Sequence, residues 1–62
     1  MLIRVIDNNT NNTLIQTNTN NWADAMIKYI ENYRKSYNNA TIEWYYTDDA
    51  DGRPYTTFKT FH

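Results

Sequence analysis

Residues 21–37 read NWADAMIKYIENYRKSY, and this stretch decides how the rest of the chain is arranged. At about 100° per residue, its large apolar side chains share one arc of an α-helix and most of its charged side chains share the other. Asn21 can cap the first turn, and Asp24 lies three residues on, at the positive end of the helix dipole. The apolar arc consists of Trp22, Met26, Tyr29, Ile30, Tyr33 and Tyr37. We therefore expect a helix that buries one face.

Length and composition limit what the chain can be. It has 62 residues, no cysteine and a formal net charge of −1. We expect one domain over residues 1–62 with a modest core, held together without disulfides or a thiolate metal site. The near-neutral charge argues against bulk attraction to nucleic acid or to an anionic membrane. No stretch resembles a signal peptide or a membrane span, so the expected location is the cytoplasm, away from membranes.

The amino-acid composition suggests what kind of genome encodes the chain. Asparagine, isoleucine and tyrosine have AT-rich codons, whereas the chain has one glycine and one proline, whose codons are GC-rich. We therefore expect a small protein from an AT-rich genome, such as that of a phage or plasmid.

Two short strands are expected before the helix. Leu2–Asp7 is β-branched and apolar, and residues 13–17 are centred on a second apolar pair. The asparagine-rich residues 8–12 between them form a turn. On the first strand Ile3 and Val5 share one face, and Leu2, Arg4 and Ile6 share the other. The result is an N-terminal hairpin.

A second hairpin is expected after the helix, with residues 41–47 and 55–61 as its strands and the acidic residues 48–54 as its reversal. Strand alternation assigns each side chain to a face. One face takes Ile42, Trp44, Tyr46, Thr56, Phe58 and Thr60, and the other takes Glu43, Tyr45, Thr47, Tyr55, Thr57, Lys59 and Phe61.

The order ββαββ predicts an α+β fold, with one helix packed across one face of a four-stranded sheet. Pairing the first and last strands side by side and parallel at the centre gives a right-handed crossover, which is the β-grasp arrangement. The sheet face opposite the helix then stays open to solvent.

The chain resembles the immunoglobulin-binding domains of streptococcal protein G. The likeness is carried by Glu43-Trp44-x-Tyr46-x-Asp48-Asp49-Ala50 followed by Thr57-Phe58, and by Lys28, Asn32 and Tyr33 on the helix. In that family one helix edge and the start of the third strand bind antibody Fc. By position, the resemblance implies a binding edge of Lys28, Asn32, Lys35, Glu43 and Trp44. Because Ile27, Glu31 and Tyr37 differ from the family, this edge is an alternative surface for some protein other than an antibody.

Nothing in the chain points to catalysis. His62 is the only histidine and stands at the chain end, where it makes a poor general base. Glu31 and Glu43 are the only glutamates, and no feature makes them an acid–base couple. We therefore expect a protein that is not an enzyme.

One acidic stretch, Asp49-x-Asp51-Gly52, is similar to part of a calcium loop. The EF-hand pattern would start with an acidic residue and end with a glutamate at position twelve. Here Thr47 and Phe58 stand at those positions. We expect a solvated turn with no metal and no cofactor.

The open sheet face is the expected binding surface. Aromatic, apolar and basic side chains gather there, as is typical of protein interfaces. The predicted set is Leu2, Arg4, Ile6, Tyr45, Tyr55, Lys59 and Phe61, with Leu2, Ile6, Tyr45 and Phe61 forming a contiguous patch. The expected function is a protein-binding module, such as an inhibitor or modulator of a host protein, with a homodimer as one option. The alternative is single-stranded nucleic acid stacked on the same face, which the slightly acidic chain makes less favourable.

Overall fold

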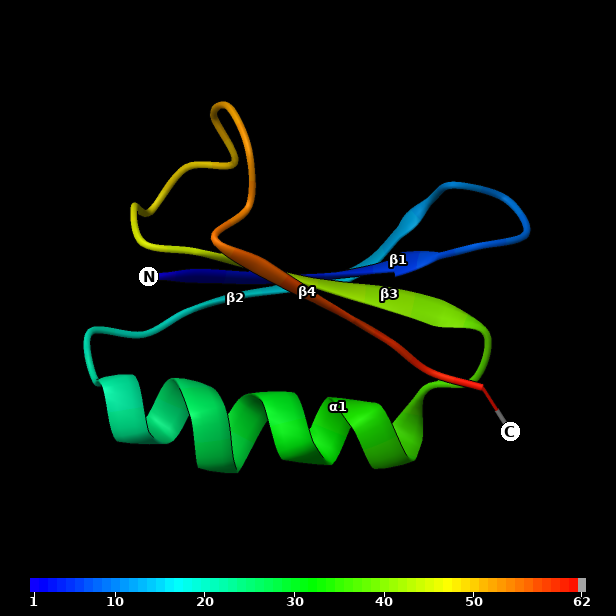
Figure 1. Ribbon diagram of the computed structural model, residues 1–62, viewed down its shortest axis with the longest axis horizontal. Helices are drawn as coiled ribbons and strands as arrows, with labels where there is room; N and C mark the ends of the chain where they lie inside the picture. The colour runs from blue at the N-terminus through cyan, green and yellow to red at the C-terminus, as the bar shows by residue number, and fades with distance from the viewer. Residues whose placement is uncertain (62) are drawn as a thin grey trace.

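The computed structural model describes residues 1–61 and shows four strands and a helix in the order ββαββ (Figure 1). The strands are β1 (Leu2–Asp7), β2 (Thr13–Asn18), β3 (Ala40–Tyr45) and β4 (Thr56–Lys59). The helix consists of a π-helical segment, η1 (Asp24–Ile30), continued by α1 (Glu31–Ser36), and it crosses one face of the sheet. The predicted α+β class is confirmed. Within residues 1–61, no helix is both long and apolar enough to cross a bilayer.

The strand order differs from the expected one. The sheet runs β2-β1-β3-β4 with every neighbouring pair antiparallel, so β1 pairs with β3 and not, in parallel, with β4. β1 and β3 bury side chains on both faces and therefore occupy the centre. β4 is short and rich in threonine and lysine, which suits an exposed edge. The predicted central pairing of the first and last strands is wrong.

The ends of the helix follow local signals. Asn21 Oδ1 accepts hydrogen bonds from the backbone N–H groups of Ala23 at 2.9 Å and Asp24 at 3.3 Å, so the predicted cap forms. After the helix, Asn39 adopts a left-handed φ of 53°. Asn11 does the same in the first hairpin, with a φ of 65°. Asparagine thus serves at positions where glycine is the more common choice.

The π-helical segment changes which side chains face the sheet. Ala25 is 0% exposed and Ile30 is 1% exposed, although they are five residues apart. In an α-helix such residues would point about 140° away from each other. The wider i→i+5 turns of η1 bring them toward one face. This face packs on Ile3, Val5, Ile42 and Trp44 of the sheet, which with Ala40 complete the buried core.

Candidate functional site

The sheet face opposite the helix, here called the far face, carries the side chains that alternation assigns to it. Leu2 pairs with Tyr45, and Arg4 pairs with Glu43, across β1 and β3. Leu2 is nevertheless 0% exposed and Tyr45 only 4% exposed. Figure 1 shows that the segment between β3 and β4 rises on this side of the sheet. The expectation that Leu2 and Tyr45 are exposed on an open face is therefore wrong.

A hydrogen-bonded charge network occupies the middle of the far face. Arg4 donates to Glu43 Oε1 from Nε at 2.9 Å and from Nη2 at 2.7 Å. The Tyr45 hydroxyl donates to the same oxygen at 3.0 Å. Burial and this hydrogen bond raise the pKa of Tyr45 above its ordinary value, and the bond to Glu43 raises the pKa of Arg4. These three side chains bond to one another, and the Arg4 and Glu43 side chains are only 27% and 17% exposed, so little of the network is open to a partner.

The expected apolar patch on the far face is not contiguous. Because β3 lies between β1 and β4, Phe61 beyond the end of β4 is separated from Leu2. Phe61 is 73% exposed, Lys59 is exposed and Ile6 is half-buried. Tyr55, also in the predicted set, packs on other aromatic rings outside the far face.

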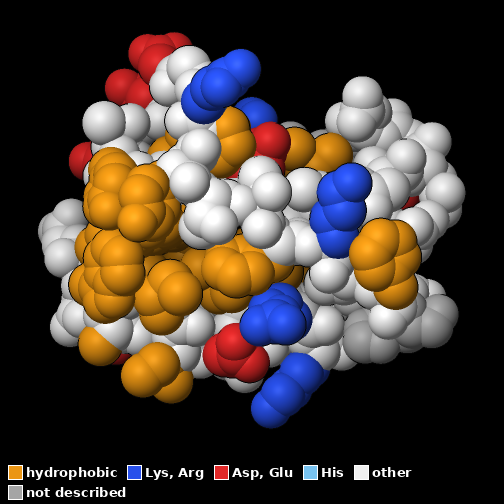
Figure 2. Space-filling view, viewed as in Figure 1, with side chains coloured by type: hydrophobic (Ala, Val, Ile, Leu, Met, Phe, Trp, Pro, Cys, Tyr) orange, Lys and Arg blue, Asp and Glu red, His pale blue; other side chains and the backbone are white. Residues whose placement is uncertain are grey.

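Four aromatic rings form a cluster, here called the aromatic cluster: Trp22, Trp44, Tyr46 and Tyr55. Trp22 meets Trp44 edge-on at 4.6 Å, and the rings of Tyr46 and Tyr55 each lie 5.0 Å from Trp44. Trp44 is 0% exposed, whereas Trp22, Tyr46 and Tyr55 are 49%, 56% and 57% exposed. The space-filling view in Figure 2 shows hydrophobic side chains gathered at the end of the molecule where the helix begins. Three half-exposed rings thus rest on one buried ring.

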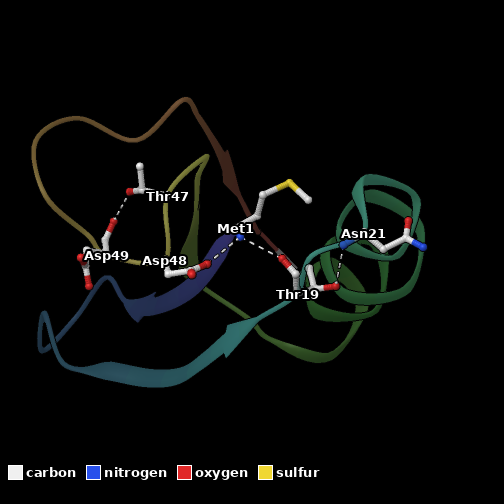
Figure 3. Close-up of polar contacts among 6 residues, drawn as sticks. All are labelled: Met1, Thr19, Asn21, Thr47, Asp48 and Asp49. Atoms are coloured by element: carbon white, nitrogen blue, oxygen red, sulfur yellow. Dashed lines mark hydrogen bonds and ion pairs between the residues drawn. The ribbon is translucent and has the colours of Figure 1, made fainter.

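Backbone and terminal contacts hold the segments that carry these rings. The N–H of Tyr55 donates to the carbonyl of Trp44 at 2.8 Å. The amino group of Met1 donates to the carbonyl of Thr19 at 2.8 Å and to Asp48 Oδ1 at 3.0 Å (Figure 3). One cation therefore ties together the segment that leads into the helix and the segment that leaves β3.

A pocket lies where the far face meets the aromatic cluster. The neighbouring Tyr55 side chain raises the pKa of Tyr46 above its ordinary value. Beside this pair the pocket encloses about 170 Å³, and its lining is Tyr45, Tyr46, Thr47, Asp51, Arg53 and Tyr55. Aromatic walls and two opposite charges can hold a flat or cationic group.

The alternative binding edge is not a single surface. Lys28, Asn32 and Lys35 are exposed on the helix. Alternation along β3, however, sends Glu43 to the far face and buries Trp44 at 0% exposure beneath the helix. The predicted grouping of these five residues is therefore wrong.

Of the aromatic cluster, Tyr46 is predicted in the core on the strand face shared with Trp44, and its 56% exposure shows that this is wrong, whereas Trp22 is predicted on the apolar arc with partial burial at the helix end. β3 ends at Tyr45, so the alternation that would turn Tyr46 inward stops one residue earlier. Trp22 lies just before η1, at the N-terminal end of the helix. The sequence does hold a signal, because aromatic residues flank the polar segment 47–54 on both sides.

Among residues 1–61, no group of three or more histidine, cysteine or acidic side chains could hold a metal ion. The histidine considered as a general base, His62, lies outside the described residues. Comparisons with protein families, with curated proteins and with solved structures find no match to this chain. The resemblance to protein G domains therefore stays a prediction.

Proposed function

We propose that this chain is a small, non-enzymatic protein-binding module and that the aromatic cluster is its contact surface. The observation that carries the proposal is the contrast in burial between Trp44, at 0% exposure, and the three half-exposed rings packed on it. Tryptophan and tyrosine dominate the binding energy of many interfaces because they bury a large area with few rotatable bonds. Rings already fixed by their neighbours lose little freedom when a partner covers them.

Other exposed hydrophobic side chains are dispersed over the molecule. Leu14 lies on β2, Ile27 on η1 and Phe61 beyond β4. Single exposed apolar residues are normal on protein surfaces, whereas a group of large rings marks a contact site. The concentration of rings therefore favours the aromatic cluster over the far face.

Single-stranded nucleic acid is the second candidate, because exposed rings can stack unpaired bases. The segment between β3 and β4 carries Asp48, Asp49 and Asp51 against a single cation, Arg53. Carboxylates beside the rings repel a phosphate backbone. The local charge thus favours a protein over a nucleic acid.

The biological setting proposed here rests on composition. The abundance of residues with AT-rich codons suits a phage or plasmid gene. A small binding module of that origin would act in the cytoplasm as an inhibitor or modulator of a host protein. A second copy of the chain is the other occupant that the rings could accept.

A capture experiment with matched variants tests the proposal. The immobilised wild type is compared with a cluster variant, Tyr46→Ser with Tyr55→Ser, and with a control variant, Leu14→Ser with Phe61→Ser. Both variants remove two exposed hydrophobic side chains, but only the first pair lies in the aromatic cluster. We expect the wild type and the control to retain the same protein from a host lysate and the cluster variant to lose it.

Three results would contradict this account. The first is that the cluster variant retains the partner, and the second is that the control variant loses it. The third is that the wild type shifts single-stranded DNA or RNA in a salt-dependent manner and retains no protein. Sedimentation of the purified chain at increasing concentration checks self-association, which the cluster variant should abolish if the partner is a second copy.

A further inference from the structure

We infer that the pocket beside the aromatic cluster takes a cationic side chain, arginine or lysine, of the protein partner. This inference rests on the proposed function and specifies what the cluster recognises. The pocket opens next to the exposed rings, so a partner lying across them can place one long side chain in it.

The walls of the pocket suit a cation. Tyr45, Tyr46 and Tyr55 line it together, and the faces of tyrosine rings attract ammonium and guanidinium groups. The rings of Tyr46 and Tyr55 pack on each other with centroids 4.4 Å apart, which places two of these walls side by side. A volume of about 170 Å³ accommodates the end of one basic side chain.

The charge around the pocket also suits a cation. Asp51 lines the pocket, and Asp49 stands in the same segment. Within residues 1–61, neither carboxylate forms an ion pair, whereas the third aspartate of the segment, Asp48, is bound to the Met1 amino group. Figure 2 shows acidic side chains adjoining the hydrophobic patch. An incoming cation meets carboxylates that are still free to pair with it.

Arg53 is the competing charge in the pocket wall. It is exposed, and it forms no ion pair with any of residues 1–61. An exposed arginine side chain can turn into solvent when another cation enters the pocket, at the cost of some repulsion. Replacing Arg53 should therefore improve the binding of a cation.

The chain already uses this kind of contact internally. The guanidinium of Arg4 lies 5.8 Å from the ring centre of Tyr45, which is itself a pocket wall. Arg34 similarly lies 5.5 Å from the ring centre of Phe58. The pocket offers two further tyrosine rings, Tyr46 and Tyr55, for an external cation.

The test is an NMR titration of the intact chain with short blocked peptides. One peptide carries a central arginine, a second carries lysine, and a third carries citrulline, which keeps the shape of arginine without its charge. We expect the arginine and lysine peptides to shift the ring resonances of Tyr46 and Tyr55 with a dissociation constant in the millimolar range. The citrulline peptide should leave them unchanged, and comparing the first two shows which cation fits better.

Three variants test the inference, because two are expected to weaken binding of the arginine peptide and one is expected to strengthen it. Asp51→Asn should weaken binding of the arginine peptide about twofold to fivefold, the worth of one exposed charge pair. Arg53→Gln should strengthen it by a similar factor. Tyr46→Leu keeps an apolar wall but removes the ring face, and it should weaken binding about as much as Asp51→Asn.

The inference is overturned if the citrulline peptide binds as well as the arginine peptide, if neither cation binds, or if Arg53→Gln weakens binding. The last result would mean that Arg53 supports binding of the peptide and does not compete with its cation. None of these results touches the broader proposal, because capture of a partner by the aromatic cluster is measured separately with the Tyr46→Ser and Tyr55→Ser variant.

Discussion

The indole ring of Trp22 meets that of Trp44 edge to face, with ring centroids 4.6 Å apart and an angle of 84° between the planes. One ring is 49% exposed at the start of the helix, and the other is 0% exposed on β3. The contact therefore joins the proposed contact surface directly to the core. The stability of the fold and the position of the exposed rings depend on the same buried side chain.

Replacing the buried ring should unfold much of the protein. Trp44→Ala is expected to lower the free energy of unfolding by about 3–5 kcal/mol, a large share of the stability of so small a domain. Trp44→Phe should cost clearly less, because an aromatic ring remains and the buried Nε1 donor, which has no acceptor among residues 1–61, is removed. Denaturant unfolding compares the two, and a Trp44→Ala protein as stable as the wild type would refute the packing described here.

The exposed ring of the pair should matter less for stability than for binding. Trp22→Ala is expected to cost about 1–2 kcal/mol, in line with a half-buried ring that makes one good aromatic contact. The matched control is Ile27→Ala, which removes a 71% exposed side chain of the same helix and should change stability little. Thermal unfolding measures both variants. Equal losses from the two would show that the Trp22–Trp44 contact contributes nothing.

The charge network on the far face makes stability fall at high pH. Tyr45 has a raised pKa in the folded protein, so its contribution is complete below the ordinary tyrosine pKa of about 10 and is lost as the pH rises through the folded-state value. Tyr45→Phe should cost about 1 kcal/mol near neutral pH, because the hydrogen bond to Glu43 is lost. It should also flatten the fall in melting temperature as the pH rises above about 10. If the melting temperatures of the wild type and Tyr45→Phe fell equally steeply with pH, Tyr45 would not be the group responsible.

Tyr45→Ala combined with Phe61→Ser should destabilise the fold through Tyr45 alone. Tyr45 is buried and hydrogen-bonded, whereas Phe61 is 73% exposed. The two single variants, compared by thermal unfolding, should therefore differ, with Phe61→Ser close to the wild type. A normal melting temperature for Tyr45→Ala would restore the expectation of an open far face.

The acidic segment should neither stabilise the fold nor bind calcium. Replacing Asp49 and Asp51 by asparagine is expected to change the free energy of unfolding by less than about 0.5 kcal/mol, with or without calcium. Melting temperatures measured with calcium and with a chelator check this. A calcium-dependent rise in the wild type that the double variant lacks would reveal a metal site.

The local elements of the fold could be predicted because their signals are local. The cap at Asn21 acts within a few residues, and most of the predicted apolar arc lies in the core or packs against it. Strand neighbours could not be fixed in the same way, because alternation assigns a side chain to a face and says nothing of which strand lies beside it. The opposite charges of Arg4 and Glu43, each in mid-strand, were the one hint that these two strands pair.

The candidate site was predicted only in part. Tyr55 belongs to the predicted set, but Tyr46 is predicted in the core and Trp22 is predicted to be partly buried at the helix end. Their exposure depends on where β3 ends and on the entry of the chain into the helix, and neither follows from periodicity. Leu2 and Tyr45 were expected on an open face that the segment after β3 instead covers.

The most direct test of the central claim is site-specific photo-crosslinking. The photoreactive residue p-benzoylphenylalanine is placed in turn at Tyr46 in the aromatic cluster, at Phe61 beyond β4 and at Lys28 on the helix, and each protein is irradiated in a lysate of the host. We predict a covalent adduct with one partner protein from position 46 and none from positions 61 and 28. An adduct from either of those positions, with none from position 46, would contradict the assignment of the aromatic cluster as the contact surface.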